Sequence, residues 1–229
     1  MDNKDYIIIS LGGSIIVPEQ IDTNLLKSFT KTIKEYAEKG FNFVIITGGG
    51  KTCRNYNDSL KQIIENPSSI DLDWMGIAAT RLNAELVRIA FGDLAYEKII
   101  LNPDSIPETH KPILVGGGWQ PGNSSDLAAV HMAKSIGAKK IINLSNIDHV
   151  YNKNPRDYTD AIPLESSSWE DFRKLLPVDW DPGANVPFDP VAAREAEKFG
   201  LTVVVMNGKN IENLKDYLDG KTFIGTTIK

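Results

Sequence analysis

One stretch of the chain has the residue types and the spacing of a phosphate-binding loop. An apolar run enters residues 116–118, which are all glycine, a Pro-Gly turn follows, and Ser124, Ser125 and Asp126 precede a helix-forming run. Serine and aspartate are preferred at helix N-caps, where they accept hydrogen bonds from free backbone N–H groups. Glycines let a backbone approach a ligand closely, and a helix N-terminus attracts phosphate. The stretch predicts a phosphate site, although one such loop alone is interpreted equally well as a tight structural connection.

Two further glycine loops shift the balance toward function. Each follows a short, β-branched apolar run of the kind that forms strands buried on both faces of a parallel sheet. Parallel strands bring their carboxyl ends to one edge, and ligands bind beyond that edge. Three phosphate-sized loops there suit a nucleotide and a second phosphate, so phosphoryl transfer is favoured. The two additional loops are Gly12, Gly13 and Ser14, after residues 6–11, and Gly48, Gly49 and Gly50, after residues 43–47.

The elements that position these loops alternate between strands and helices along the chain. This alternation predicts an α/β fold with a mostly parallel central sheet covered by helices on both faces. No linker or repeat divides the chain, so one domain over residues 1–229 is expected. Strands are expected at residues 6–11, 43–47, 98–101, 113–115, 141–144, 202–206 and 222–228, the last at a sheet edge, and helices at about 25–37, 51–64, 71–91, 124–136, 169–176, 191–199 and 211–218.

Composition limits the classes of partner and compartment. The net charge is -5, which gives no general attraction to nucleic acid or to an acidic membrane, so neither is expected as a partner. Cys53 is the single cysteine, which excludes an intrachain disulfide and fits a reducing compartment. The N-terminus is polar, unlike a signal peptide, and no apolar run is long enough to span a membrane. A cytoplasmic protein is expected.

Several motifs, in order along nearly the whole chain, resemble the amino acid kinase family, specifically its uridylate (UMP) kinase branch and most closely the archaeal type. That resemblance implies a three-layer αβα fold and transfer of the ATP γ-phosphate to UMP, with Mg²⁺, giving UDP and ADP. It also implies a homo-oligomer, usually a hexamer built from dimers. The motifs are Leu11-Gly-Gly-Ser14, Thr47-Gly-Gly-Gly-Lys51, Asp73-x-x-Gly-Ile-x-x-Thr-Arg-x-Asn-Ala84, residues 116–126, Ser145-Asn-Ile-Asp-His-Val-Tyr151, Asn154-Pro-Arg156, Phe188-Asp-Pro-Val-Ala-Ala193 and Gly225-Thr-Thr-Ile.

The resemblance also implies roles for individual residues, with the acceptor nucleotide mainly on residues 1–135 and ATP mainly on residues 136–229. Arg54 suits the acceptor phosphate because its planar guanidinium can bind two phosphate oxygens. The remaining acceptor residues are Gly48, Gly49, Gly50, Asp73, Gly76, Thr80, Asn83, Ser124 and Ser125, of which Thr80 and Asn83 lie on a helix face that could read uracil. The reacting centre would hold Gly12, Gly13, Lys51 and Asp126. The ATP side would hold Ser14, Asn146, Asp148, Tyr151, Asn154, Pro155, Arg156 and Asp189.

Some positions depart from the family pattern. Ser10 stands where many members carry a lysine that stabilises charge on the transferring phosphate, and losing such a cation can cost several kcal/mol of transition-state stabilisation. Lys51 or Arg156 could supply the missing charge. No residues are assigned as protein ligands of a metal. The other departures are His149 for glycine, Asn154 for aspartate and Asn123 for histidine or glutamine.

Two alternatives to a UMP kinase stay open. Ser10 and Asn154 are compatible with a non-catalytic nucleotide binder, such as a sensor or storage assembly on the same scaffold. A kinase for another small phosphorylated acceptor is the second alternative, but its relatives use a histidine near the second glycine loop, and residues 51–54 contain none. An assay of phosphate transfer distinguishes all three.

Overall fold

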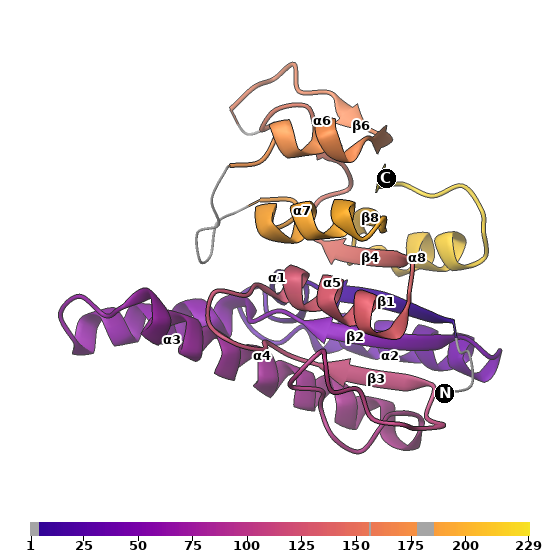
Figure 1. Cartoon of the computed structure of the whole chain (residues 1–229), viewed down its shortest axis with the longest axis horizontal. Helices are drawn as coiled ribbons and strands as arrows, with labels where there is room; N and C mark the ends of the chain where they lie inside the picture. Colours follow the sequence, from indigo (N-terminus) through magenta and orange to yellow (C-terminus); the bar gives the residue numbers. More distant parts are fainter. Residues whose placement is uncertain (1–4, 156, 178–185) are drawn as a thin grey trace.

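The computed structural model describes residues 5–155, 157–177 and 186–229, and the elements are identified within them (Figure 1). The strands are β1 (Tyr6–Leu11), β2 (Asn42–Thr47), β3 (Ile113–Gly116), β4 (Lys140–Ser145), β5 (Val150–Tyr151), β6 (Pro163–Leu164), β7 (Ser166–Ser167), β8 (Thr202–Asn207) and β9 (Thr226–Ile228). The helices are α1 (Gly13–Ile16), α2 (Thr23–Glu38), α3 (Gly50–Ile63), α4 (Ser69–Phe91), α5 (Ser125–Ile136), α6 (Trp169–Lys174), α7 (Pro190–Lys198) and α8 (Ile211–Leu218), with a 3₁₀ turn η1 (Gly92–Leu94).

The described strands form one mixed sheet in the order β3-β2-β1-β4-β8-β9-β7, and β5 pairs separately with β6. The first five strands of that order run parallel, while β9 is antiparallel to β8. Leu11 at the end of β1 lies opposite both Thr47 and Leu144, and Leu144 lies opposite Met206. The register therefore brings the ends of β1, β2, β4 and β8 to a common edge, as the sequence predicted.

Alternate strand residues face two separate hydrophobic clusters, one on each side of the sheet. Helices α5, α6 and α7 pack on the side that includes Ile8 and Val44. Helices α1, α2, α4 and α8 pack on the side that includes Ile9 and Ile45. Since both faces are covered, these strands are apolar along their whole length. The predicted three-layer αβα architecture is confirmed.

Helix α3 differs from the others because none of its residues is buried. It packs on α4, and Figure 1 shows the two helices extending beyond the edge of the sheet. The turn between them ends at Ser68, whose side chain forms a capping box with Asp71. This capping box fixes the start of α4. Helix α4 carries Asp73, Thr80 and Asn83, which bond the second and third glycine loops. Helix α4 thus begins two residues earlier than predicted.

The strand predicted at residues 98–101 does not form. Ile100 makes a single bridge to Gly116 of β3, with its N–H donating to Val115 O at 2.8 Å. Pro103 follows closely, and proline both lacks an N–H and restricts the residue before it. The segment therefore touches the edge of the sheet without continuing along it.

The C-terminal strand is also shorter than predicted and is not at an edge. Only β9 forms within residues 222–228, and it pairs with β8 on one side and β7 on the other. The two-residue strands β5, β6 and β7 were missed, because so short a stretch carries no periodicity. Residues 12–14 were predicted as a loop, but only Gly12 precedes α1, because Gly13 and Ser14 are the first two residues of its single turn.

Candidate active site

The first two glycine loops are in direct contact. A Cβ atom on Gly13 would overlap the backbone nitrogen of Gly50 and lie 2.7 Å from the carbonyl carbon of Gly48. A Cβ on Gly48 would in turn overlap the backbone nitrogen of Gly13. Gly50 also has a φ of +61°, which side chains other than glycine rarely adopt. Only residues without a side chain allow the ends of β1 and β2 to approach this closely.

The third glycine loop joins the same edge through helix α4. The Thr80 hydroxyl accepts a hydrogen bond from Gly118 N at 2.7 Å and donates one to Ile77 O at 2.7 Å. One turn further, Asn83 Nδ2 donates to Gly48 O at 2.8 Å. Helix α4 therefore holds the second and third loops together, and the three loops meet at one edge of the sheet.

These contacts define what Thr80 and Asn83 do in this state. The Asn83 side chain is 2% exposed, and its amide bonds the second loop. The Thr80 hydroxyl has one donor and one acceptor contact within the protein. Both residues lie beside the predicted acceptor site, but they support its loops. Direct contact of either side chain with uracil stays a prediction.

Other predicted acceptor residues surround the same loops. Asp73 accepts a hydrogen bond from Gly122 N at 2.8 Å, which links the start of α4 to the third loop. Gly76 faces Cys53, since a Cβ there would lie 3.4 Å from Cys53 Sγ. Arg54 Nη2 donates to Pro18 O at 3.3 Å, and the side chain is exposed.

The two serines predicted for the acceptor phosphate lie at the start of α5. Ser124 is the N-cap, and its hydroxyl accepts a hydrogen bond from Leu127 N at 3.1 Å. Ser125 is the first helical residue. The opening of a helix at this point places free backbone N–H groups at the edge of the sheet, as the sequence predicted.

Asp126 lies between the glycine loops and the second half of the chain. Its Oδ1 accepts a hydrogen bond from the Ser10 hydroxyl at 2.9 Å, and its Oδ2 accepts one from Asp189 N at 3.1 Å. The pKa of Asp126 is raised to about 6, chiefly by burial and to a smaller extent by the Asp189 carboxylate, while the hydrogen bonds from Ser10 and from the Asp189 backbone oppose this rise. The carboxyl group thus joins α5 to two segments that are distant in sequence.

Asp189 completes this group of polar residues. It is 3% exposed, caps α7 by accepting from Ala192 N at 2.7 Å, and also bonds the Ser124 side chain. Burial raises its pKa, and its hydrogen bonds to the backbone and to Ser124 oppose that change. Asp126 and Asp189 therefore form a pair of neighbouring carboxyl groups that connect α5 with α7.

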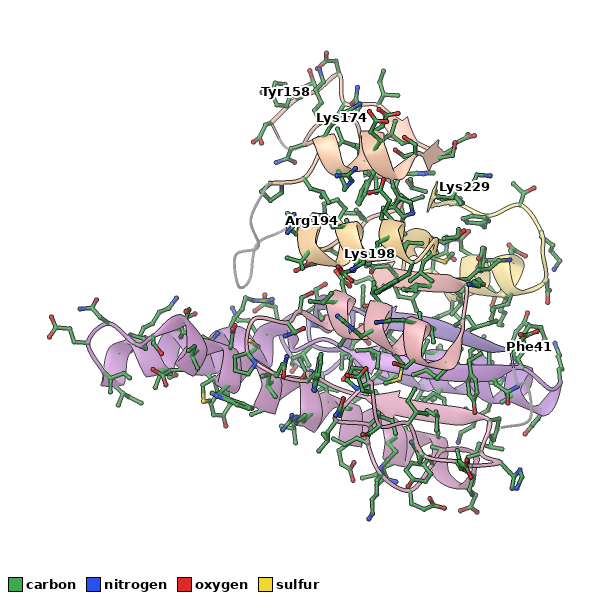
Figure 2. All side chains as sticks on the ribbon, viewed as in Figure 1. Phe41, Tyr158, Lys174, Arg194, Lys198 and Lys229 are labelled. Atoms are coloured by element: carbon green, nitrogen blue, oxygen red, sulfur yellow. The ribbon has the colours of Figure 1, made fainter. Side chains whose placement is uncertain are left out.

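A cavity of 390 Å³ opens beyond the end of β4, and Pro187, two residues before Asp189, forms part of its wall. Four residues predicted for the ATP side line it: Asn146, Tyr151, Asn154 and Pro155. Lys174 of α6, labelled in Figure 2, forms part of its wall. Ser145, Ile147, Val150, Asn152, Lys153, Leu175, Val186 and Pro187 also line it.

The remaining predicted residues lie near these groups or outside the described chain. Asp148 accepts a hydrogen bond from Asn207 Nδ2 at 2.9 Å, next to the carboxyl ends of β4 and β8. Ser14 is half-buried in α1. Lys51 Nζ lies 3.5 Å from Glu19 Oε2. Arg156 lies outside the described residues.

Sequence reasoning missed several polar residues of this site. Asn143 is 4% exposed, and its Nδ2 lies 3.5 Å from Asp126 Oδ1 and 3.4 Å from Pro187 O. An asparagine within an otherwise apolar strand is the signal that could have identified it. Arg81 donates to Gly118 O at 3.1 Å and to Trp119 O at 2.9 Å, which fastens the third loop to α4.

Glycine loops, two neighbouring carboxyl groups and an adjacent cavity on one sheet edge are the arrangement of a small-molecule phosphotransferase. Residues 5–207 match the sequence model of the amino acid kinase family, and the chain belongs to that family. The uridylate kinase of Sulfurisphaera tokodaii is 31% identical over 97% of this chain and 98% of its own length. The uridylate kinase of Methanobrevibacter smithii is 32% identical over 97% and 98%.

Solved structures agree with these sequence matches. The uridylate kinase of Archaeoglobus fulgidus superposes with a TM-score of 0.84 at 31% identity, covering 97% of this chain and 99% of the other. The UMP kinase of Bacillus anthracis gives a TM-score of 0.76 at 17% identity, covering 98% and 96%, which supports the fold alone. Within the residues that the structure describes, no helix is both long and apolar enough to cross a membrane.

Proposed function

We propose that this protein is a cytoplasmic UMP kinase, which transfers the γ-phosphate of ATP to UMP and releases UDP and ADP. The observation that carries the proposal is the direct contact of Gly13 with Gly48 and Gly50, next to the cavity at the end of β4. Loops for two nucleotides thereby share one edge, as a direct transfer requires. Uridylate kinases at 31% and 32% identity support UMP as the acceptor. A single cysteine fits a reducing compartment.

The acceptor nucleotide binds over the second and third glycine loops. Backbone N–H groups of residues 48–50 and the start of α5 bind its phosphate, with Ser124, Ser125 and Arg54 as side-chain donors. Asp73 and Gly76 lie on the α4 surface beside these loops, where the nucleoside would lie. Thr80 and Asn83 keep the two loops at a fixed separation through their hydrogen bonds.

The donor nucleotide binds in the cavity that Asn146, Tyr151, Asn154 and Pro155 line. Its phosphates extend past Ser14, Asp148 and Asp189 toward Gly12 and Gly13 at the start of α1. The short helix and the glycine backbone present N–H groups to the transferring phosphate. Phosphoryl transfer depends mainly on such positioning and on charge stabilisation, so Asp126 need not act as a base.

Asp126 and Asp189 fit a Mg²⁺ ion that is bound together with the donor phosphates. Mg²⁺ in kinases typically uses one or two carboxylates plus substrate oxygens. Among the described residues, no group of three or more His, Cys, Asp or Glu side chains could hold a metal by itself. The pKa of Asp126 is raised chiefly by burial and also by the neighbouring Asp189 carboxylate, and a cation bound between the two would stabilise both charges. When bound, Mg²⁺ would neutralise charge on the phosphates.

A second candidate function is nucleotide binding without transfer. The observation that favours it is Ser10, which is 1% exposed and bonds Asp126, so that position carries no cation beside the reacting centre. Such a protein would bind UMP and ATP with no phosphate exchange. A kinase for another small phosphorylated acceptor is the third candidate.

A coupled assay of ADP release distinguishes these functions. It would use ATP and Mg²⁺ with UMP, CMP, dUMP, AMP and isopentenyl phosphate as separate acceptors, with calorimetry of UMP binding in parallel. The proposal predicts turnover that is fastest with UMP. Binding of UMP without turnover on any acceptor would favour the non-catalytic protein, and fastest turnover with isopentenyl phosphate would favour the third candidate.

We further propose that the chain self-associates through α4, as a dimer that builds a hexamer. Five large apolar side chains are exposed along this helix, at successive intervals of four, eight, four and three residues, which places them within about half of the helix circumference. A continuous exposed apolar face of this kind marks an interaction surface. A second copy covers it with the same face, because two-fold pairing is self-complementary. The five are Ile70, Trp74, Leu82, Leu86 and Ile89.

The solution mass tests the assembly. Light scattering coupled to size exclusion should give an even multiple of the 25.3 kDa chain, with six copies as the expected species. A monomer at micromolar concentration would contradict both the dimer and the hexamer.

A further inference from the structure

The end of β8 completes the edge on which the glycine loops lie. Gly208 N donates to Ser145 O at 2.8 Å, and Ser145 lines the donor cavity. A Cβ on Gly208 would lie 3.2 Å from Ile15 Cγ1 of α1, the helix that the first glycine loop opens. Gly208 therefore lies between the donor cavity and that loop. Lys209 is the next residue and is exposed.

The other described cations around this edge are already engaged on the protein. Lys51 pairs with Glu19, and Arg54 and Arg81 donate to backbone carbonyls on the acceptor side. Arg194 of α7 interacts electrostatically with Asp189 and lowers the pKa of that carboxyl group. On the wall of the donor cavity, Lys153 and Lys174 each pair with a carboxylate, Asp160 for Lys153 and Glu170 and Asp171 for Lys174.

Lys209 differs from all of these. Its backbone N–H donates to Asn207 Oδ1 at 3.0 Å, which fixes the turn that leads from β8 to α8. Its ammonium group makes no ion pair or hydrogen bond with the part of the chain that the structure describes. The flexible four-carbon stem leaves that charge available to a ligand at the junction of the cavity and the first loop.

The centre itself has a deficit of positive charge. Asp126 and Asp189 contribute two carboxyl groups, Arg194 beside Asp189 supplies one positive charge, and Ser10 of β1 contributes only a hydroxyl. A polyphosphate that enters this site adds further negative charge. During transfer, charge builds up on the departing diphosphate, which lies on the donor side of the edge.

We infer that Lys209 is a catalytic residue that binds the departing diphosphate of the donor; the inference rests on the proposed kinase function. The bond between the γ-phosphorus and the bridging oxygen breaks, and its electron pair stays on the diphosphate. An oxygen of the acceptor phosphate forms the new bond to phosphorus. Lys209 keeps its proton throughout and stabilises the charge on the departing group.

Replacement of Lys209 tests this role. Lys209→Met removes the charge and keeps the length of the apolar stem, while Lys209→Arg keeps the charge. Lys140→Met is the matched control, because Lys140 is an exposed lysine at the opposite, amino end of β4. Each variant would be measured for kcat, for KM of UMP and, by calorimetry, for ADP affinity.

We expect Lys209→Met to lower kcat about 100-fold, as loss of one preorganised donor does, and to weaken ADP binding about tenfold. KM for UMP should change less than about threefold, because Lys209 lies away from the acceptor loops. Lys209→Arg should retain most of the turnover, and Lys140→Met should match the wild type.

The outcomes separate this inference from the proposed function. If the wild type turns over UMP and Lys209→Met keeps kcat and ADP affinity within about threefold of it, Lys209 has no such role and the kinase assignment is unaffected. If the wild type has no turnover, the proposed function fails. The ADP titration then still decides whether Lys209 binds a diphosphate.

Discussion

Replacing Asp126 with asparagine should make the stability of the folded protein less dependent on pH and remove most of its turnover. The pKa of Asp126 rises from 3.8 to about 6, chiefly because the carboxyl group is withdrawn from water. A carboxyl group whose pKa is raised by folding destabilises the fold once it ionises. Asparagine carries no charge and keeps an oxygen that can accept the Ser10 hydroxyl hydrogen. Its Nδ2 cannot accept from Asp189 N, but that loss is the same at every pH. The variant therefore removes the cost of a charged group without emptying the site.

The magnitude follows from the pKa shift. A shift of about two units corresponds to about 3 kcal/mol of stability. The cost first appears as the pH rises through the ordinary value of 3.8 and is complete above about 6. Between about pH 5 and about pH 8 it grows by roughly 1.4 kcal/mol. Relative to Asp126→Asn, the wild type should therefore lose that much stability over this interval.

Urea unfolding followed by tryptophan fluorescence measures the difference at both pH values. One protein concentration must be used throughout, because the stability of an oligomer depends on concentration. Asp104→Asn, which removes a carboxylate from an exposed loop, is the control and should show no such change with pH. If Asp126→Asn differs from the wild type by the same amount at both pH values, the carboxyl group has an ordinary pKa and the account of the site is wrong.

Three further substitutions test the supports of the site and the proposed assembly. Thr80→Val removes the acceptor for Gly118 N and should cost about 1–2 kcal/mol and raise KM for UMP more than KM for ATP; an unchanged KM for UMP would contradict a role in the acceptor site. Gly13→Ala forces a methyl group against Gly50 and should cost several kcal/mol in thermal unfolding, about 3 or more; a wild-type melt would show that the loops are not in contact. Leu82→Glu should reduce the mass seen by light scattering while circular dichroism is retained, and an unchanged mass would exclude this face as the interface.

Much of the fold was predictable from local sequence because its determinants are local. The strands β1, β2, β4 and β8 are continuous apolar runs, and burial on both faces requires that pattern. Asp189 before Pro190 marked the start of α7, and the cap forms as expected. The sequence also predicted that the glycine loops meet at one edge, because each loop follows a strand and parallel strands have their carboxyl ends at the same edge.

The errors concern features that depend on distant partners. Whether residues 98–101 continue a sheet depends on a neighbouring edge, and two-residue strands have no period to detect. The bond from the Asn83 amide to the Gly48 carbonyl was likewise not evident from the sequence, and a contact of Asn83 with uracil stays a prediction. Asn143 and Lys209 gain their significance only from the strands that lie beside them. Periodicity along one segment does not contain that information.

The most direct measurement is a ³¹P NMR time course of the purified protein with ATP, Mg²⁺ and UMP. It observes both products, so it tests whether donor and acceptor phosphates meet on the shared edge. The account predicts UDP and ADP appearing in equal amounts, with Asp126→Asn much slower than the wild type. Spectra in which UMP remains unchanged, or in which ATP is lost to inorganic phosphate without UDP, would contradict it.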